Sequence, residues 1–100
     1  MLYRVRRYVA VPENLAAFHD FFNRYLLPVQ LRHGARLIGR WETEDGEVLA
    51  IWKCDDEAPY RRIAAAVAAD PEAAVAQEIR ATIGLLFTEK HESFARSTMR

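Results

Sequence analysis

The sequence contains few residues that crosslink a chain or bind a metal. Its 100 residues include a single cysteine, Cys54, and three histidines, at positions 19, 33 and 91. One cysteine cannot form an intrachain disulfide, and the histidines lack the close spacing of metal ligands. We therefore expect a protein of a reducing compartment, with no metal site and no cofactor.

An excess of charge and a long apolar segment are absent as well. Fourteen basic and fourteen acidic residues cancel, so there is no net positive field to attract nucleic acid or an anionic membrane surface. No segment approaches the roughly 20 apolar residues that span a bilayer. Residues 1–7 contain three arginines and lack the apolar core of a signal peptide. We expect a soluble, cytoplasmic protein that binds neither nucleic acid nor membrane.

The motifs of the best-marked enzyme classes are missing too. The sequence has no glycine-rich phosphate loop, no Gly-x-Ser-x-Gly turn and no helical His-Glu-x-x-His pair. It also lacks the run of aromatic residues and glycines that marks an RNA-recognition motif. Motifs alone therefore assign no reaction.

What the sequence does contain is enough apolar residues for one folded domain. Apolar residues make up 51% of the chain and charged residues 28%, as in ordinary globular proteins. A chain of 100 residues is a common size for a domain with one core. We expect a single domain over residues 1–92, followed by a flexible tail over residues 93–100.

The periodicity of apolar residues predicts the order of secondary structure. Alternation over residues 2–11 predicts a strand, and apolar residues three and four positions apart over 13–31 predict an amphipathic helix. Pro28 lacks a backbone N–H, so this helix should kink or restart near Leu27. Asp45-Gly46 favours a tight turn between antiparallel strands. The remaining expected segments are strands over 35–43 and 47–54, helices from about 57 and over 72–83, and a strand from 85 to about 91.

The order β, α, β, β, α, β is typical of the ferredoxin-like arrangement, an α+β fold with a four-stranded antiparallel sheet. Helices cover one face of such a sheet and leave the other bare. We expect Leu2, Tyr8, Ala50 and Trp52 on the bare face, where they would expose several hundred Å² of apolar surface. A second copy of the chain is the simplest cover, so that two sheets pack as a dimeric α/β barrel.

Three segments carry a resemblance to a known family. Residues 3–8 read Tyr-Arg-Val-Arg-Arg-Tyr, residues 33–41 read His-Gly-Ala-Arg-Leu-Ile-Gly-Arg-Trp, and residues 70–72 read Asp-Pro-Glu. They resemble the opening strand, the His-Gly-x-x-x-Gly-x-Trp strand and the Asp-Pro-Glu helix start of the NIPSNAP family, in the dimeric α/β-barrel superfamily. The resemblance implies this fold, a homodimer, and a small molecule held between sheet and helices.

Arg6 and Tyr8 are the first candidates for a ligand site. Both lie on the strand face that we expect to line a pocket, where a buried cation needs an anionic partner. Arg6 is therefore a candidate to bind a carboxylate, an enolate or a phenolate. The alternative is an internal ion pair between Arg6 and Glu42 or Glu47.

Histidines and aromatic residues supply the other candidates. His33, beside a helix-ending glycine, and His19, on the first helix, can act as acid or base near neutral pH, or can be surface or packing residues. Trp41 and Trp52 could form an aromatic wall for a flat ligand, or could pack in the core. Tyr25 offers a hydroxyl at the inner edge of the first helix.

Two functions follow from these candidates and from the resemblance. In the first, the chain binds a small aromatic or anionic molecule and resembles the cofactor-independent monooxygenases, isomerases and lyases of the superfamily. Arg6 would then hold an anionic oxygen, and Tyr8 or His33 would move a proton. In the second, the chain is a noncatalytic homodimeric binding or interaction module. The first function requires an apolar cavity with convergent polar groups.

Overall fold

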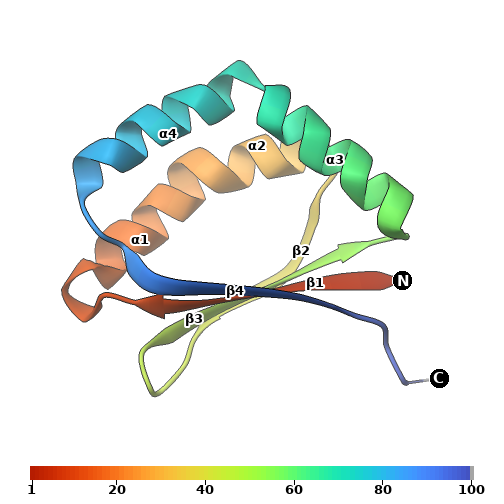
Figure 1. Cartoon of the computed structure of the whole chain (residues 1–100), viewed down its shortest axis with the longest axis horizontal. Helices are drawn as coiled ribbons and strands as arrows, with labels where there is room; N and C mark the ends of the chain where they lie inside the picture. Colours follow the sequence, from red (N-terminus) through yellow and green to blue (C-terminus); the bar gives the residue numbers. More distant parts are fainter. Residues whose placement is uncertain (100) are drawn as a thin grey trace.

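Four antiparallel strands form one sheet, and the helices lie on one side of it (Figure 1). The computed structural model describes residues 1–99, and Arg100, the end of the expected tail, lies outside the described residues. The strands are β1 (Leu2–Ala10), β2 (Arg36–Glu42), β3 (Glu47–Cys54) and β4 (Phe87–Ala95). Their order across the sheet is β2-β3-β1-β4, so the first and third strands are central. This confirms the predicted α+β, ferredoxin-like fold.

The first helical region is one rod with a change of register in its middle. It comprises the 3₁₀ turn η1 (Pro12–Asn14), helix α1 (Leu15–Phe21), the π-helical turn η2 (Phe22–Leu26) and helix α2 (Leu27–Arg32). The ring and the missing N–H of Pro28 disfavour regular helix just before it. The Leu27 N–H accordingly bonds to the carbonyl of Phe22, five residues back. The kink expected near Leu27 is therefore a π turn, a feature that is frequent at functional sites.

Helices α3 (Glu57–Ala69) and α4 (Pro71–Ile83) form a thin cover over the sheet. Each begins at an aspartate, because Asp56 and Asp70 accept hydrogen bonds from backbone N–H groups of the first turn. Both helices are rich in alanine, and Ala76 is the one buried residue that the two contribute. None of the helices within residues 1–99 combines the length and the apolar composition needed to cross a bilayer.

The helices cover the opposite face of the sheet from the one predicted. Leu2, Ala50 and Trp52 are buried, with 7%, 2% and 8% of their surface exposed, and Tyr8 packs edge-on against Phe18 of α1. The expectation that these residues face away from the helices is therefore wrong. Alternation along a strand separates two faces, but both faces of β1 and β3 are largely apolar, so alternation does not say which one meets the helices.

The main core lies at one end of the sheet. Val48 and Leu86 are fully buried there, and Phe18 and Phe21 of α1 pack against them together with Ala76. The backbone N–H of Val11 donates to the carbonyl of Leu86, which ties β1 to the segment before β4. These contacts close the space between the sheet and the helices at this end.

Strand β4 is longer than predicted. It pairs with β1 up to Ala95, so the segment from Ser93 to Ala95 belongs to the sheet, beyond the domain boundary expected at residue 92. The strand lies at the edge of the sheet, and all its residues after Phe87 are exposed. Because few apolar residues mark it, its end could not be read from an apolar pattern.

Candidate functional site

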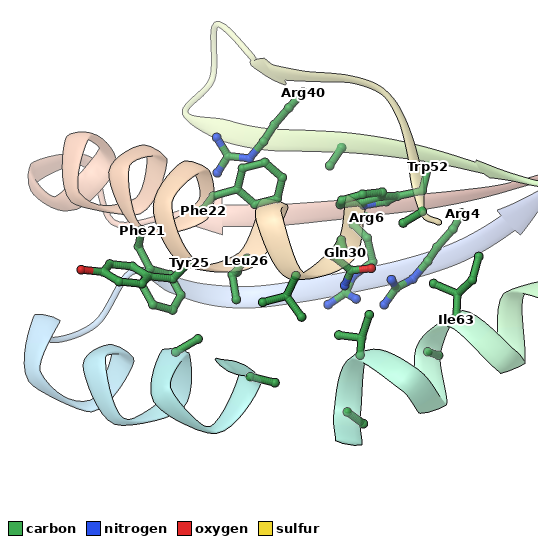
Figure 2. A pocket seen from close by; sticks show the side chains of 18 of the residues that line it. Arg4, Arg6, Phe21, Phe22, Tyr25, Leu26, Gln30, Arg40, Trp52 and Ile63 are labelled. Atoms are coloured by element: carbon green, nitrogen blue, oxygen red, sulfur yellow. The ribbon is translucent and has the colours of Figure 1, made fainter. Parts of the chain in front are cut away.

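A cavity of about 800 Å³ lies between the sheet and helices α2, α3 and α4 (Figure 2). Its floor includes Arg4, Arg6 and Tyr8 of β1 and Trp52 of β3, and three residues of the π turn, Phe22, Tyr25 and Leu26, line its side. The small alanines of α3 and α4 leave this space open, because they reach little of the way to the sheet. Its volume is within the range of small-molecule sites.

The lining of the cavity is cationic although the chain as a whole has no net charge. No aspartate or glutamate of the described chain is among the lining residues. Seven basic residues contribute to it: Arg4, Arg6, Arg36, Arg40, Lys53, Arg80 and Lys90. Arg36 is paired with Asp55 at 2.8 Å, and Lys53 lies opposite Tyr3, on the face of the sheet without helices, so Arg4, Arg6 and Arg40 are the cations of the cavity floor that matter most. Positive charge at the wall of a partly enclosed, apolar space attracts anions more strongly than the same charge in bulk water.

Two of these arginines share one carboxylate. Arg4 Nε and Nη2 each lie 2.8 Å from Glu92 Oε2, and Arg6 Nη1 lies 3.1 Å from the same oxygen. The Nε of Arg6 is buried without a hydrogen-bond partner. The alternative partners expected for Arg6 are wrong, because Glu47 pairs with Arg7 on the uncovered face and Glu42 contacts His19. The group carries two positive charges and one negative charge.

Aromatic rings surround this charged group. Trp52 packs against Phe22, with ring centroids 6.1 Å apart, and the Arg6 guanidinium lies 5.5 Å from the ring of Tyr8. Figure 2 shows the side chains of Arg4, Arg6 and Gln30 gathered below the Trp52 ring. An anion bound here would therefore meet donors on one side and an apolar wall on the other.

A bulge in β2 brings Arg40 to the same side of the sheet. The pairing with β3 shifts between Leu37 and Gly39, so Arg40 lies opposite Ala50. Ala50 in turn lies opposite Arg6 on its other side. Arg40 and Arg6 therefore stand in one row across the sheet, with the small side chain of Ala50 between them.

Arg40 is held between aromatic rings. Its guanidinium carbon lies 4.8 Å from the ring centre of Phe18 and 4.4 Å from that of Phe22, and its Nη2 is buried without a partner. Burial lowers the pKa of Arg40 below its ordinary value, because the charged form loses water. Figure 2 shows this side chain reaching from β2 over the Phe22 ring.

His19 positions Arg40 from outside the cavity. Arg40 Nη1 donates to His19 Nδ1 at 2.6 Å, and His19 Nε2 lies 2.6 Å from Glu42 Oε1. Because Nδ1 accepts a hydrogen bond, Nε2 carries the proton and donates to Glu42. His19 lines a smaller hollow of about 290 Å³ beside the cavity, so the structure places it behind Arg40.

His33 lies at the junction of the helices, away from the cavity lining. Its Nε2 is 2.7 Å from the carboxylate of Asp70, which also accepts a hydrogen bond from Arg32 at 2.8 Å. Hydrogen bonds from Arg32, from the backbone N–H of Glu72 and from His33 hold the pKa of Asp70 well below its ordinary value of 3.8. This cluster fastens the end of α2 to the corner between α3 and α4.

Trp41 and Trp52 lie on opposite faces of the sheet, so the expected aromatic wall does not form. After the bulge Trp41 lies opposite Leu49, on the uncovered face, whereas Trp52 lies opposite Leu37 on the covered face. Trp41 is 47% exposed, and its ring lies across Gly39, which has no Cβ to obstruct it. The wall beside Arg6 is instead made by Trp52 and Phe22.

Tyr25 lines the cavity as predicted from its place on the helix, but at a distance from the arginine pair. Its ring packs beside Phe21, with centroids 5.8 Å apart. In Figure 2 its hydroxyl lies at the opposite end of the view from Arg4 and Arg6. Of the predicted site residues, the structure therefore brings Arg6, Tyr8 and Trp52 together.

Arg4, Phe22, Arg40 and Glu92 belong to the site but were not predicted from the sequence. Arg40 was missed because strict alternation does not anticipate the bulge before it, although the glycine beside Trp41 is a signal for one. Glu92 was missed because the strand was expected to end at about His91. Among residues 1–99 no cluster of three or more histidine, cysteine, aspartate or glutamate side chains is arranged to hold a metal ion.

Comparisons with known proteins agree with this architecture. The model of the family described as NIPSNAP matches residues 3–95. No curated protein matches the chain. Among solved structures, an uncharacterised NIPSNAP domain protein from Burkholderia xenovorans has a TM-score of 0.85 at 21% identity, covering 98% of this chain and 95% of that chain.

Two further structures show how widely the fold is shared. Protein Atu4242 from Agrobacterium tumefaciens has a TM-score of 0.83 at 20% identity, covering 96% of this chain and 92% of that chain. A proposed antibiotic biosynthesis monooxygenase from Nitrosomonas europaea has a TM-score of 0.67 at 11% identity, covering 99% of this chain and 100% of that chain. At these identities the likeness shows a common fold, which hosts more than one function.

Proposed function

This chain belongs to the NIPSNAP family, and from that premise we propose that it binds a small organic anion in the cavity between its sheet and its helices. The observation that carries the proposal is the lining of the cavity, in which Arg4, Arg6 and Arg40 meet apolar and aromatic walls and no lining residue of the described chain is an aspartate or glutamate. A ligand with an apolar body and one acidic group matches that lining.

The same lining supports a catalytic role for the site. We propose that the chain acts on its ligand as a cofactor-independent monooxygenase, isomerase or lyase, with Arg6 stabilising an anionic oxygen of the substrate. Tyr8 is the proposed proton donor, since it lines the cavity beside Arg6, whereas the side chain of His33 is bonded to Asp70. Fixed positive charge is effective in such a site because little reorganisation is needed during reaction.

Thermal unfolding with matched ligands tests the binding proposal. We would compare 2-naphthoate and decanoate with their uncharged counterparts, 2-naphthamide and decanol, each at the same concentration. We expect at least one anion to raise the unfolding temperature more than its uncharged counterpart. Absence of any shift with both anions, or equal shifts with the uncharged compounds, would contradict an anion site.

Turnover is tested separately from binding. Each stabilising compound would be incubated with the protein in air, and products would be measured by mass spectrometry. Tyr8→Phe should reduce product formation while leaving the ligand-induced shift in place, because it removes one hydroxyl and keeps the ring. Binding without any product would favour the noncatalytic module.

The uncovered face of the sheet supports a homodimer. It presents Tyr3, Val5 and Val9 of β1 with Leu49 and Ile51 of β3, and Figure 1 shows no helix on that side. Arg7 of this face is paired within the chain, since its Nη1 lies 2.8 Å from Glu47 Oε1. We propose that a second copy covers this face, because an apolar and self-complementary surface suits a two-fold symmetric contact.

A further inference from the structure

We infer that Glu92 is an exchangeable counter-ion, and that a carboxylate of the ligand takes its place on Arg6. The inference rests on the proposed function and deepens it, because it names the acidic group of the ligand. It also accounts for the two largely covered cations of this group, because the chain supplies its own carboxylate until a ligand arrives.

Glu92 is bound unequally by its two partners. Arg4 contacts Glu92 Oε2 through two nitrogens at 2.8 Å each, whereas Arg6 contacts the same oxygen through one nitrogen at 3.1 Å. The Nε of Arg6 is left without a partner. A guanidinium binds a carboxylate best through two parallel N–H groups, so Arg6 is the partner that gains most from a new carboxylate.

The Glu92 carboxylate can move out of this ion pair more easily than the two arginines can. Only 16% and 14% of the side chains of Arg4 and Arg6 are exposed, compared with 35% for Glu92. Glu92 also lies on the edge strand β4, where it can turn toward water without disturbing a second strand. A ligand would therefore displace the carboxylate from Arg6, while Arg4 can keep its contact with Glu92.

The chemistry of Glu92 selects the ligand class. The position on Arg6 is already occupied by a planar carboxylate, so a ligand carboxylate can reproduce the same hydrogen bonds without rearranging either arginine. Trp52 and Phe22 lie beside this position and would contact an apolar or aromatic body attached to that group. The expected ligand is thus an organic carboxylate with an apolar body.

Isothermal titration of charge-neutralised variants tests this exchange. Glu92→Gln removes the internal competitor and should bind 2-naphthoate at least about tenfold more tightly than the wild type, as expected when one charged hydrogen-bond partner no longer competes. The uncharged 2-naphthamide should bind both proteins within about twofold. Glu89→Gln is the matched control, because Glu89 lies on the same strand opposite Val9, on the uncovered face.

The outcomes separate the inference from the proposed function. Tighter binding in Glu92→Gln but not in Glu89→Gln supports the exchange; equal or weaker binding in Glu92→Gln overturns it and leaves anion binding intact. If 2-naphthoate binds neither wild type nor variant, the inference fails, and if decanoate also fails to bind, the proposed function fails with it. Glu92→Ala repeats the test with a variant that has no amide to replace the carboxylate.

A direct readout uses the Arg6 guanidinium itself. In the wild type, the NMR signal of the Arg6 Nε–H should shift on addition of 2-naphthoate, because this nitrogen gains its first hydrogen-bond partner. The corresponding Arg7 signal should stay in place. A shift confined to residues other than Arg6 would overturn the inference even if the titration showed tight binding.

Discussion

Replacing Arg6 with glutamine tests whether the cavity holds its ligand through this side chain. In the empty protein we expect a small loss, because Arg4 keeps its two contacts of 2.8 Å to Glu92, whereas Arg6 contributes one contact at 3.1 Å. The free energy of unfolding should fall by about 1 kcal/mol or less, as is usual for partly exposed ion pairs.

The liganded protein should lose much more. A hydrogen bond to a charged group contributes roughly 1.5–3 kcal/mol, which corresponds to an affinity about ten- to 150-fold weaker when it is lost. At about 100 times the wild-type Kd, 2-naphthoate should stabilise the wild type by about 2.7 kcal/mol. The same concentration should stabilise the variant by only about 0.3 to 1.4 kcal/mol.

Thermal unfolding with and without 2-naphthoate measures this difference. The control is Arg7→Gln, which removes the same charge from the next residue but from the uncovered face, where Arg7 pairs with Glu47. Its ligand-induced stabilisation should match that of the wild type. If 2-naphthoate stabilises Arg6→Gln as much as the wild type, Arg6 does not contact the ligand. If Arg7→Gln loses as much ligand-induced stabilisation as Arg6→Gln, the effect is one of overall charge.

Three further predictions address the dimer, the helix junction and the core. Ile51→Lys on the uncovered face should yield a monomer in sedimentation velocity, whereas Val75→Lys, at an exposed apolar position of α4, should not; a dimer in both would refute sheet-to-sheet contact. Asp70→Asn should lower the unfolding temperature at neutral pH. The pKa of Asp70 is lowered in the folded state, so the stabilisation that its carboxylate gives is present above its ordinary pKa of 3.8 and is lost as the pH falls below that value. The difference in unfolding temperature between variant and wild type should therefore narrow at low pH. A difference that does not change with pH would refute this. Leu86→Ala, at a position with 0% exposure, should lower the free energy of unfolding in urea by about 2–5 kcal/mol. A decrease below about 1 kcal/mol would mean that the core around Leu86 is not tightly packed.

Much of the fold could be predicted because local chemistry determines it. The spacing of Phe18, Phe22 and Leu26 marks a helix wherever that helix packs, and Asp45-Gly46 favours a tight turn regardless of its surroundings. Pro28 likewise disturbs the helix through its own missing N–H. These signals extend over a few residues each, so the order of strands and helices follows from the sequence alone.

The candidate site could be predicted only in part. Arg6 and Tyr8 share a face because strand residues two positions apart always do, and Trp52 joins them through the pairing of β1 with β3. The partner of Arg6 depended instead on β4, because Glu92 lies 86 positions after Arg6 in the sequence and reaches it only through the pairing of β4 with β1. Sequence pattern does not reveal such a pairing on a polar edge strand.

The tertiary structure alone decided which face of the sheet the helices cover and which side each residue of β2 faces. Both faces of β1 and β3 are apolar enough to be buried, so the choice between them depended on how α1 and α4 pack with Val48 and Leu86. The unpaired residue at the bulge in β2 then reversed the faces of the sheet on which Arg40 and Trp41 lie. A local pattern determines what a segment becomes, but the direction in which its side chains point is a property of the whole packed sheet.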